Sequence, residues 1–244
     1  MAQPDTLTAG DVHVWLAEPE AFLVSLESVD QALALLDADE QRRYHAFRFD
    51  RDRRVFLAAH LLLRTRLSLY APVAPGAWTF EKNAFGRPEV AGGLLEADGL
   101  RFNLSHTNGL VACAITRSAD VGIDVESLSR PTPGLDIAER FFSPDEFAML
   151  QKAPADEQHQ LFFAIWTLKE AYIKARGMGL SLPLDQFAFD IDGLAVRGVR
   201  FRDEIKDNPK NWRFGVQSAG HQHLLAFAVR REDGGNIQPV IHQA

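Results

Sequence analysis

The sequence predicts an α+β (α/β) protein made of two similar halves, each a small sheet packed on a long helix. Amphipathic helical periodicity and short alternating strands both occur along the 244 residues, and the order of these elements repeats. In each half a helix precedes a pair of strands, and Arg101-Phe102 in the first pair corresponds to Arg213-Phe214 in the second. We interpret this repeat as an internal duplication joined near residues 117–120, although two amphipathic hairpins can also look alike by chance.

The first half is expected to begin with a strand followed by two helices. Val12, Val14 and Leu16 occupy alternate positions, which predicts a half-buried strand. In the second of the two helices, Phe56 and Leu63 lie on one apolar face. The expected elements are the strand 12–16, the helices 29–46 and 51–70, and the strands 78–81, 100–104 and 110–116.

The second half is expected to contain a capped helix, a long helix and further strands. Ser143-Pro-Asp-Glu146 has the pattern of a capping box with proline at the first helical position. A longer helix should cover residues 156–176 and end at Gly177, because glycine tolerates the left-handed conformation that closes many helices. Strands should follow at residues 186–191, 212–217 and 224–230.

Charge and cysteine content exclude several classes of function. The chain has 26 Lys and Arg against 33 Asp and Glu, a net charge of −7, so general binding to nucleic acid or anionic membrane is not expected. Cys113 is the only cysteine, so neither a disulfide framework nor a cysteine-rich zinc site can form, which favours the cytoplasm. Asp5 and Asp11 stand where a signal peptide would be apolar, and no apolar run is long enough to cross a bilayer.

The segment Val121-Gly-Ile-Asp-Val-Glu126 places two carboxylates two residues apart. On a strand, Asp124 and Glu126 leave the same face, while the branched apolar residues point the other way. Two neighbouring carboxylates repel each other unless a cation or a proton lies between them. A solvated strand edge is the alternative interpretation of such a pair taken alone.

Two more segments offer functional groups. In Trp166-Thr-Leu-Lys-Glu-Ala-Tyr-Ile-Lys174, Glu170 and Lys174 are four residues apart and share a helical face, although an exposed salt bridge explains the pair as well. Phe102-Asn-Leu-Ser-His-Thr107 offers an amide, hydroxyls and an imidazole, or is simply a polar turn. No G-x-S-x-G segment occurs, so nucleophilic serine chemistry is not expected.

Arginine is concentrated in residues 40–66, which contain eight arginines and three carboxylates. Some of these arginines are expected to be solvated surface residues. A local excess of this size in an acidic chain also suits a ligand with several phosphates. Arg87, in the turn Phe85-Gly-Arg-Pro88, could join them.

Together these segments resemble the Sfp-type (surfactin-synthetase-activating) 4′-phosphopantetheinyl transferases. That family is marked by G-[IV]-D-x-E, then about forty residues, then [FW]-[SCT]-x-K-E-[AS]-x-x-K. The segments that begin at Gly122 and Trp166 have this order and spacing, and three upstream segments also look like family motifs. These are Phe102-Asn-Leu-Ser-His106, Phe85-Gly-Arg-Pro88 and Arg-Arg-Val-Phe-Leu-Ala-Ala-His60.

The resemblance implies a monomer of two pseudo-symmetric halves with the active site in the cleft between them. It implies that coenzyme A and an apo acyl, peptidyl or aryl carrier protein give the holo carrier protein and 3′,5′-ADP, which is holo-[acyl-carrier-protein] synthase activity. A serine of the carrier is then the nucleophile. Residues 1–118 would bind the phosphates and nucleotide of coenzyme A, and residues 119–244 would hold the metal and the carrier protein.

Mg²⁺ is the expected metal, because carboxylates without Cys or His suit a hard cation held by oxygen. Asp124, Glu126 and Glu170 are assigned as its ligands, and Glu170, or a metal-bound water that it orients, as the base for the serine. Lys174 and Lys169 would neutralise phosphate, and Glu170, Asp124 and Lys174 form the catalytic set. Contacts to coenzyme A are assigned to Arg43, Lys82, Arg87, Asn103, Ser105, His106, Asp124, Lys169, Glu170 and Lys174.

The carrier protein is expected to dock on residues 127–150, where apolar side chains surround a proline-rich loop. Arg130, Arg140 and Lys152 would form a basic rim for an acidic partner; packing of these residues on their own half is the alternative interpretation. Two other functions remain as alternatives. One is a non-catalytic module that binds coenzyme A or a carrier protein, and the other is a metal-dependent phosphodiesterase or nuclease.

Overall fold

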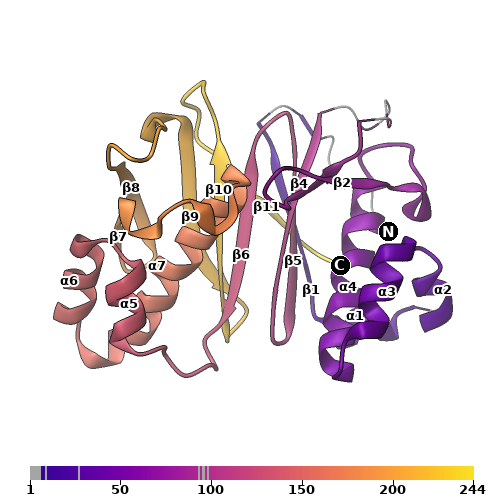
Figure 1. Cartoon of the computed structure of the whole chain (residues 1–244), viewed down its shortest axis with the longest axis horizontal. Helices are drawn as coiled ribbons and strands as arrows, with labels where there is room; N and C mark the ends of the chain where they lie inside the picture. The colour runs from indigo at the N-terminus through magenta and orange to yellow at the C-terminus, as the bar shows by residue number, and fades with distance from the viewer. Residues whose placement is uncertain (1–6, 9, 27, 93, 95–96, 98) are drawn as a thin grey trace. The chain divides into compact units, whose positions relative to one another are not determined.

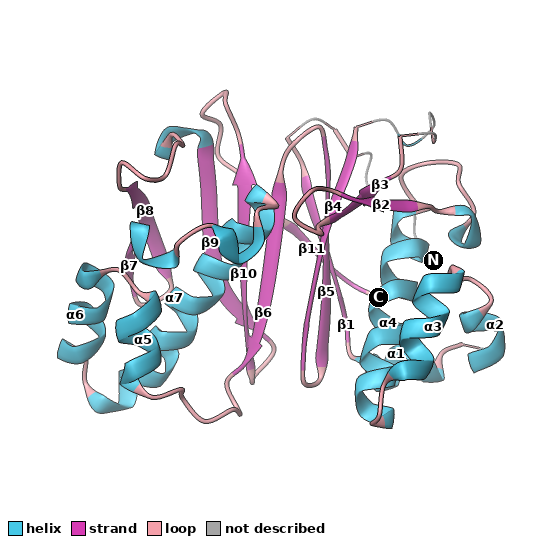
Figure 2. Cartoon of the chain, in the orientation of Figure 1, coloured by secondary structure: helices cyan, strands magenta, loops and turns pink. Residues whose placement is uncertain are grey.

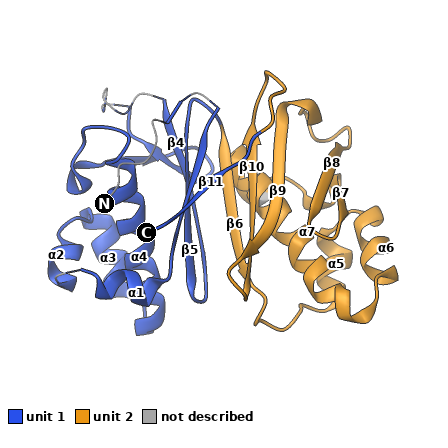
Figure 3. Ribbon diagram, turned by 180° about the vertical axis from the view of Figure 1, so that it is seen from behind, with its two compact units in different colours: residues 1–119, 237–244 blue, residues 120–236 orange. Residues whose placement is uncertain are grey.

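The structure is a computed structural model that describes residues 7–244 except positions 9, 27, 93, 95–96 and 98. It divides into two compact units (Figure 3), one formed by Met1–Ala119 with Ile237–Ala244 and the other by Asp120–Asn236. In chain order the second unit is therefore inserted between two segments of the first. The sequence suggested a single division after residue 118, but the last strand of the chain pairs with the first strand and so belongs to the first unit.

The first unit contains a four-stranded sheet with helices packed against it (Figures 1 and 2). The strand order is β11-β1-β5-β4, with β1 antiparallel to β5 and parallel to β11. A separate hairpin is formed by β2 and β3. The strands are β1 Val12–Ala17, β2 Phe80–Lys82, β3 Pro88–Val90, β4 Leu100–Thr107, β5 Leu110–Arg117 and β11 Val240–Gln243, and the helices are α1 Pro19–Val24, α2 Val29–Leu33, α3 Ala38–Ala46 and α4 Asp50–Leu67.

Helix α4 packs on this sheet through its apolar face. Leu57 and Leu61 on α4 are 1% exposed, and they belong to the same buried cluster as Val111, Cys113 and Ile115 on β5. Complete burial of an aliphatic side chain contributes roughly 1.5–3 kcal/mol, so a few such residues hold the helix on the sheet. Burial also raises the pKa of the Cys113 thiol, as expected for a core residue rather than a reactive one.

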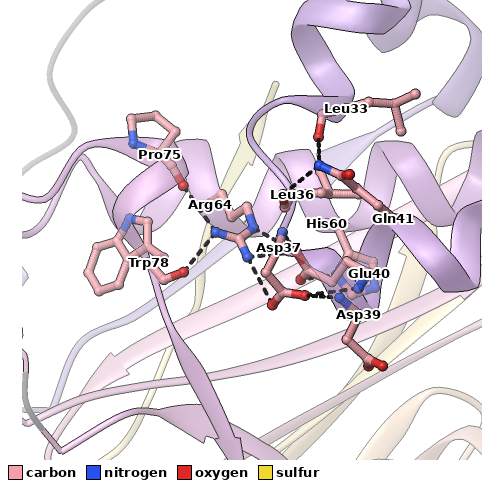
Figure 4. A network of polar contacts seen from close by, with 10 residues as sticks. All are labelled: Leu33, Leu36, Asp37, Asp39, Glu40, Gln41, His60, Arg64, Pro75 and Trp78. Carbon is pink, nitrogen blue, oxygen red and sulfur yellow. Dashed lines mark hydrogen bonds and ion pairs between the residues drawn. The ribbon is translucent and has the colours of Figure 1, made fainter.

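A buried ionic network fastens α3 to α4 (Figure 4). Nδ1 of His60 lies 2.7 Å from Oε1 of Glu40, and Nη2 of Arg64 donates to Oε2 of Glu40 at 2.6 Å. Arg64 also donates to the carbonyl oxygens of Pro75 and Trp78. Burial alone would raise the pKa of Glu40, but the surrounding hydrogen bonds and the charges of His60 and Arg64 lower it to about 2. The carboxylate is therefore ionised at neutral pH.

The second unit contains a three-stranded antiparallel sheet in the order β6-β10-β9, covered by one long helix, α7 (Figure 2). Two shorter helices precede α7, and a β7–β8 hairpin follows it. The strands are β6 Val121–Ser127, β7 Phe187–Asp192, β8 Ala195–Phe201, β9 Trp212–Ala219 and β10 His223–Arg230, and the helices are α5 Leu135–Phe141, α6 Pro144–Lys152 and α7 Ala155–Arg176.

Strand β6 and helix α7 are in direct backbone contact at Gly122. A Cβ atom at this position would overlap the carbonyl oxygen of Ala171 and the backbone nitrogen of Ala175. Only glycine allows this approach, which explains the glycine of the segment Gly122-Ile-Asp-Val-Glu126. The close contact brings the polar residues of β6 next to those of α7.

The two units repeat one order of elements, which confirms the predicted two-half fold. Each has a first strand, a long helix, a small hairpin and then two paired strands. When β11 is left aside, the last strand of each set, β5 or β10, lies between the other two strands of its sheet. The strands that carry Arg101-Phe102 and Arg213-Phe214 are β4 and β9, which hold the same place in their sheets. The capping box at Ser143 is also confirmed, with both of its hydrogen bonds formed.

Some expected elements are corrected by the structure. The helix expected over residues 29–46 is two helices, because Asp37 accepts hydrogen bonds from the backbone N–H groups of Asp39 and Glu40 and caps a new helix there. Helices α1 and α5 and strands β3, β8 and β11 were not anticipated. Within the described residues, no helix is long and apolar enough to cross a membrane.

Candidate active site

Strand β6 presents the two carboxylates of the acidic motif on one face. Gly122, Asp124 and Glu126 alternate along the strand, so their side-chain positions all face helix α7, which touches β6 at Gly122. Val121 and Ile123 are completely buried. Asp124 is also buried, at 5% exposed, which is costly for a carboxylate unless it is paired.

Helix α7 supplies the partner of Asp124. Nζ of Lys174 donates to Oδ1 of Asp124 at 2.6 Å, and their side chains are 28% and 8% exposed. Glu170 lies one turn earlier on the same helical face, as its spacing of four residues from Lys174 predicts. The structure thus brings together groups that are about fifty residues apart in the sequence.

The carboxylates of this site are close enough to change each other's ionisation. Burial, together with the charges of Asp124 and Glu126, raises the pKa of Glu170 to about 7, and the charge of Lys174 opposes this rise. Burial and the charge of Asp124 also raise the pKa of Glu126, while Arg130 lowers it through an ion pair of 2.7 Å. Concentrated negative charge of this kind favours a cation or a proton at the site.

The donor chemistry of Asp124, Glu126 and Glu170 fits a hard divalent cation, because all three offer carboxylate oxygen. Among the described residues, however, no three His, Cys, Asp or Glu side chains are already arranged as a set of metal ligands. Lys174 forms an ion pair with Asp124, and Arg130 forms one with Glu126. A bound cation would replace these two basic residues in neutralising the carboxylates.

Lys169 does not fit the role of a phosphate contact that the sequence suggested. It is fully buried, and its Nζ donates to the carbonyl oxygens of Leu184 and Phe187 at 2.7 and 2.6 Å and pairs with Glu146 at 2.8 Å. An ammonium group with all three hydrogens used in this way has none left for a ligand. Lys169 anchors the helix, and the adjacent Glu170 faces the site.

Glu146 is the partner that sequence reasoning missed. The capping box predicted its bond to Ser143, and the structure shows this bond together with a hydrogen bond from the backbone N–H of Phe189. The capping pattern describes contacts within one helix end only. It contains no signal for the ion pair with Lys169, which lies on another helix.

Apart from the buried Lys169, the residues assigned to coenzyme A lie in the first unit or in the site just described. Arg43 is exposed on α3 with its guanidinium 5.0 Å from the Phe56 ring, and Lys82 is exposed at the end of β2. Arg87 follows Gly86, whose φ of 88° closes the turn of the β2–β3 hairpin. On β4, Asn103 and Ser105 are buried side chains of one face, and His106 is exposed near the end of the strand.

Family comparisons agree with the motifs and with the two-unit fold. Residues 120–228 match the 4′-phosphopantetheinyl transferase superfamily, and residues 23–118 match the N-terminal part of a 4′-phosphopantetheinyl transferase. The chain is 39% identical to the 4′-phosphopantetheinyl transferase HetI of Nostoc sp. over 180 residues, which are 72% of this chain and 73% of that one.

Two further relatives cover more of the chain. A Bacillus subtilis 4′-phosphopantetheinyl transferase is 33% identical over 210 residues, which are 84% of this chain and 86% of that one. The human L-aminoadipate-semialdehyde dehydrogenase-phosphopantetheinyl transferase is 27% identical over 242 residues, 94% of this chain and 76% of that one. The resemblance drawn from the motifs is confirmed: the chain belongs to the 4′-phosphopantetheinyl transferase superfamily and transfers 4′-phosphopantetheine from coenzyme A to carrier proteins.

Proposed function

We propose that this transferase requires Mg²⁺ and that Asp124, Glu126 and Glu170 hold it. One observation carries the proposal: Asp124 and Glu126 on β6 lie close enough to Glu170 on α7 that their charges add to the effect of burial, and the pKa of Glu170 rises to about 7. Neighbouring carboxylates at buried and half-buried positions repel one another, and a bound cation would relieve this repulsion. When bound, Mg²⁺ would polarise the phosphoryl oxygen and stabilise the leaving 3′,5′-ADP.

Glu170 is the proposed base for the carrier serine. The serine oxygen forms a bond to the β-phosphorus of coenzyme A, the bond from that phosphorus to 3′,5′-ADP breaks, and the serine proton passes to a carboxylate oxygen of Glu170. A pKa of about 7 suits a group that must accept a proton near neutral pH. Because Glu170 is also a proposed metal ligand, a bound cation would lower the pKa of its carboxyl group.

Lys174 is proposed to neutralise charge on the transferring phosphate. Its ammonium group pairs with Asp124 and its side chain is 28% exposed, so the group can move between the carboxylate and a phosphate oxygen without entering the core. In the first unit, we propose that coenzyme A is bound by Arg43, Lys82, Arg87, Asn103, Ser105 and His106.

Mass spectrometry of an apo carrier protein tests the metal requirement. The enzyme, stripped of metal with EDTA, is incubated with coenzyme A and the carrier, with and without added Mg²⁺. We expect the carrier to gain the phosphopantetheine mass only with Mg²⁺, and the variants Asp124→Asn and Glu170→Gln to be inactive. Full transfer in EDTA would refute the metal proposal and leave the family assignment intact.

The carrier protein is proposed to dock on residues 127–150 of the second unit. Leu135 on α5 is 49% exposed, and Arg140 on the same helix lies 5.2 Å from the Phe141 ring, which provides an apolar surface with a basic group beside it. Arg130 is less suitable as a probe of docking, because it pairs with Glu126 at the proposed metal site. Arg140→Glu should raise KM for the carrier and leave KM for coenzyme A unchanged. Equal effects on both constants would place the carrier elsewhere.

We also propose that the enzyme works as a monomer in the cytoplasm. The buried free thiol of Cys113 is compatible with a reducing compartment. Light scattering at micromolar concentration tests the first point, and fractionation of the producing cell tests the second.

A further inference from the structure

Helix α7 carries a second set of polar side chains on the side opposite Glu170 and Lys174. Tyr172 and Arg176 follow Glu170 and Lys174 by two residues each, which turns them about 200° around the helix axis. Tyr172 is completely buried, whereas Lys174 is 28% exposed. The two sides of the last turns of α7 therefore have different environments.

The carboxylate of Asp207 accepts hydrogen bonds from both of these side chains, Tyr172 and Arg176. Asp207 lies in the loop between β8 and β9, and its Oδ2 accepts hydrogen bonds from Tyr172 Oη at 2.9 Å, Arg176 Nη1 at 2.7 Å and Trp212 Nε1 at 2.9 Å. The Arg176 Nη1 also donates to Tyr172 Oη at 2.8 Å. Burial raises the pKa of Tyr172, so its hydroxyl remains a proton donor to the carboxylate.

Local hydrogen bonds hold Asp207 in its loop. The backbone N–H of Asp207 donates to the carbonyl oxygen of Ile205, which is 4% exposed, and Oδ1 of Asp207 accepts from the N–H of Asn208. The Asp207 and Arg176 side chains are 9% and 21% exposed. A charge-assisted hydrogen bond at this depth contributes more than one at the surface.

The last turn of α7 is where such an anchor matters for the reaction. The helix ends at Gly177, and Lys174 lies within this final turn, where helices fray first. A displacement of about 1 Å in a catalytic group can reduce the rate a hundredfold. On one side of this turn Lys174 contacts Asp124, and on the opposite side Arg176 contacts Asp207.

We infer that Asp207 is a positioning residue, which fixes the last turn of α7 through Tyr172 and Arg176 and so keeps Lys174 against Asp124. This inference rests on the proposed roles of Lys174 and Asp124. It assigns to Asp207 no contact with either substrate. Loss of the anchor should therefore lower kcat and leave KM for coenzyme A unchanged.

The test compares Asp207→Ala, Asp207→Asn and Tyr172→Phe with the control Asp192→Ala. Asp192 forms an exposed ion pair with Arg197 on the β7–β8 hairpin of the same unit, so this variant removes an aspartate–arginine pair elsewhere. We expect kcat to fall at least tenfold in Asp207→Ala and less in Asp207→Asn, which keeps an acceptor. KM for coenzyme A should change less than twofold, and the control should match the wild type. Hydrogen exchange in residues 173–177 should be faster in the Asp207 variants.

A double-mutant cycle with Lys174→Ala identifies the route of the effect. If Asp207 acts through Lys174, Asp207→Asn should change kcat less than twofold in the Lys174→Ala background. Unchanged kcat in folded Asp207→Asn and Tyr172→Phe, or an equal fall in both backgrounds, would overturn the inference. These two mild variants decide the matter if Asp207→Ala does not fold. Wild-type activity of Lys174→Ala alone would instead show that the proposed function of that residue fails.

Discussion

Nζ of Lys174 donates a 2.6 Å hydrogen bond to Oδ1 of Asp124, which joins helix α7 to strand β6 at the centre of the proposed site. The two residues come from two different motifs of the sequence. Their contact brings the acidic strand motif and the helical motif together within the second unit. It also gives the carboxylate a counter-charge when no cation is bound.

Lys174→Ala should reduce kcat by about a hundredfold or more, as is usual when a group that stabilises developing charge is removed. The variant also leaves Asp124 without its ammonium partner, so the melting temperature should fall. Steady-state transfer to an apo carrier and thermal unfolding measure the two effects. Lys206→Ala removes an exposed lysine of the same unit and should change neither. Equal rates for both variants would contradict the role of Lys174.

Glu170→Gln should stabilise the metal-free protein at high pH. The pKa of Glu170 in the fold, about 7, is above the ordinary value of 4.5, so this carboxyl lowers stability as the pH rises from 4.5 through 7. The glutamine variant should therefore melt a few degrees higher than wild type at pH 8.5 in EDTA and equally at pH 4. Glu204→Gln, at an exposed position, should show no such difference. A difference in melting temperature between Glu170→Gln and wild type that does not change with pH would contradict the raised pKa of Glu170.

Glu40 should make the first unit sensitive to acid. Its pKa of about 2 in the fold is below the ordinary 4.5, so its stabilising contribution is complete above pH 4.5 and is lost as the pH falls toward 2. The contribution is on the order of 3 kcal/mol, from about 1.4 kcal/mol per pKa unit. Urea unfolding between pH 7 and pH 3 should show a smaller loss of stability in Glu40→Gln than in wild type. Parallel pH profiles would contradict the assignment.

Gly122→Ala should damage the site through the backbone. The added Cβ would overlap Ala171 and Ala175, so β6 and α7 must move apart, and overpacking of this kind costs about 1–3 kcal/mol or more. We expect a lower melting temperature together with a large loss of kcat. Gly198→Ala, on β8, is the matched control because a Cβ there meets no atom within 4 Å. A fully active Gly122→Ala would show that the close contact is unnecessary.

Arg43, Arg87 and His106 should act mainly through coenzyme A binding. A charge-assisted contact to phosphate contributes roughly 1.5–3 kcal/mol, so each alanine variant should raise KM for coenzyme A by about ten- to a hundredfold. KM for dephospho-coenzyme A, which lacks the 3′-phosphate, should rise less in these variants. Arg42→Ala is the control, because Arg42 is the exposed neighbour of Arg43 and pairs with Asp39. The assignment of these residues to the 3′-phosphate is wrong if none of the three variants reduces the difference between KM for coenzyme A and KM for dephospho-coenzyme A.

Local patterns along the chain predict the geometry within each motif and, through the motifs, the family. The two-residue spacing of Asp124 and Glu126 sets their common face on a strand, and the four-residue spacing of Glu170 and Lys174 sets theirs on a helix. The capping box at Ser143 and the stop at Gly177 were predictable for the same reason. Each of these patterns depends on interactions that reach only a few residues along the chain.

Long-range packing, by contrast, sets which of these groups meet and which are buried away from the site. Lys169 and Glu170 are adjacent, yet successive residues of a helix point about 100° apart, and the packing of α6 and β7 buries Lys169 with Glu146. Strand β11 likewise returns to β1 from the far end of the chain. Partners so distant in sequence leave no periodic signal, because they are selected by which apolar faces must be buried together.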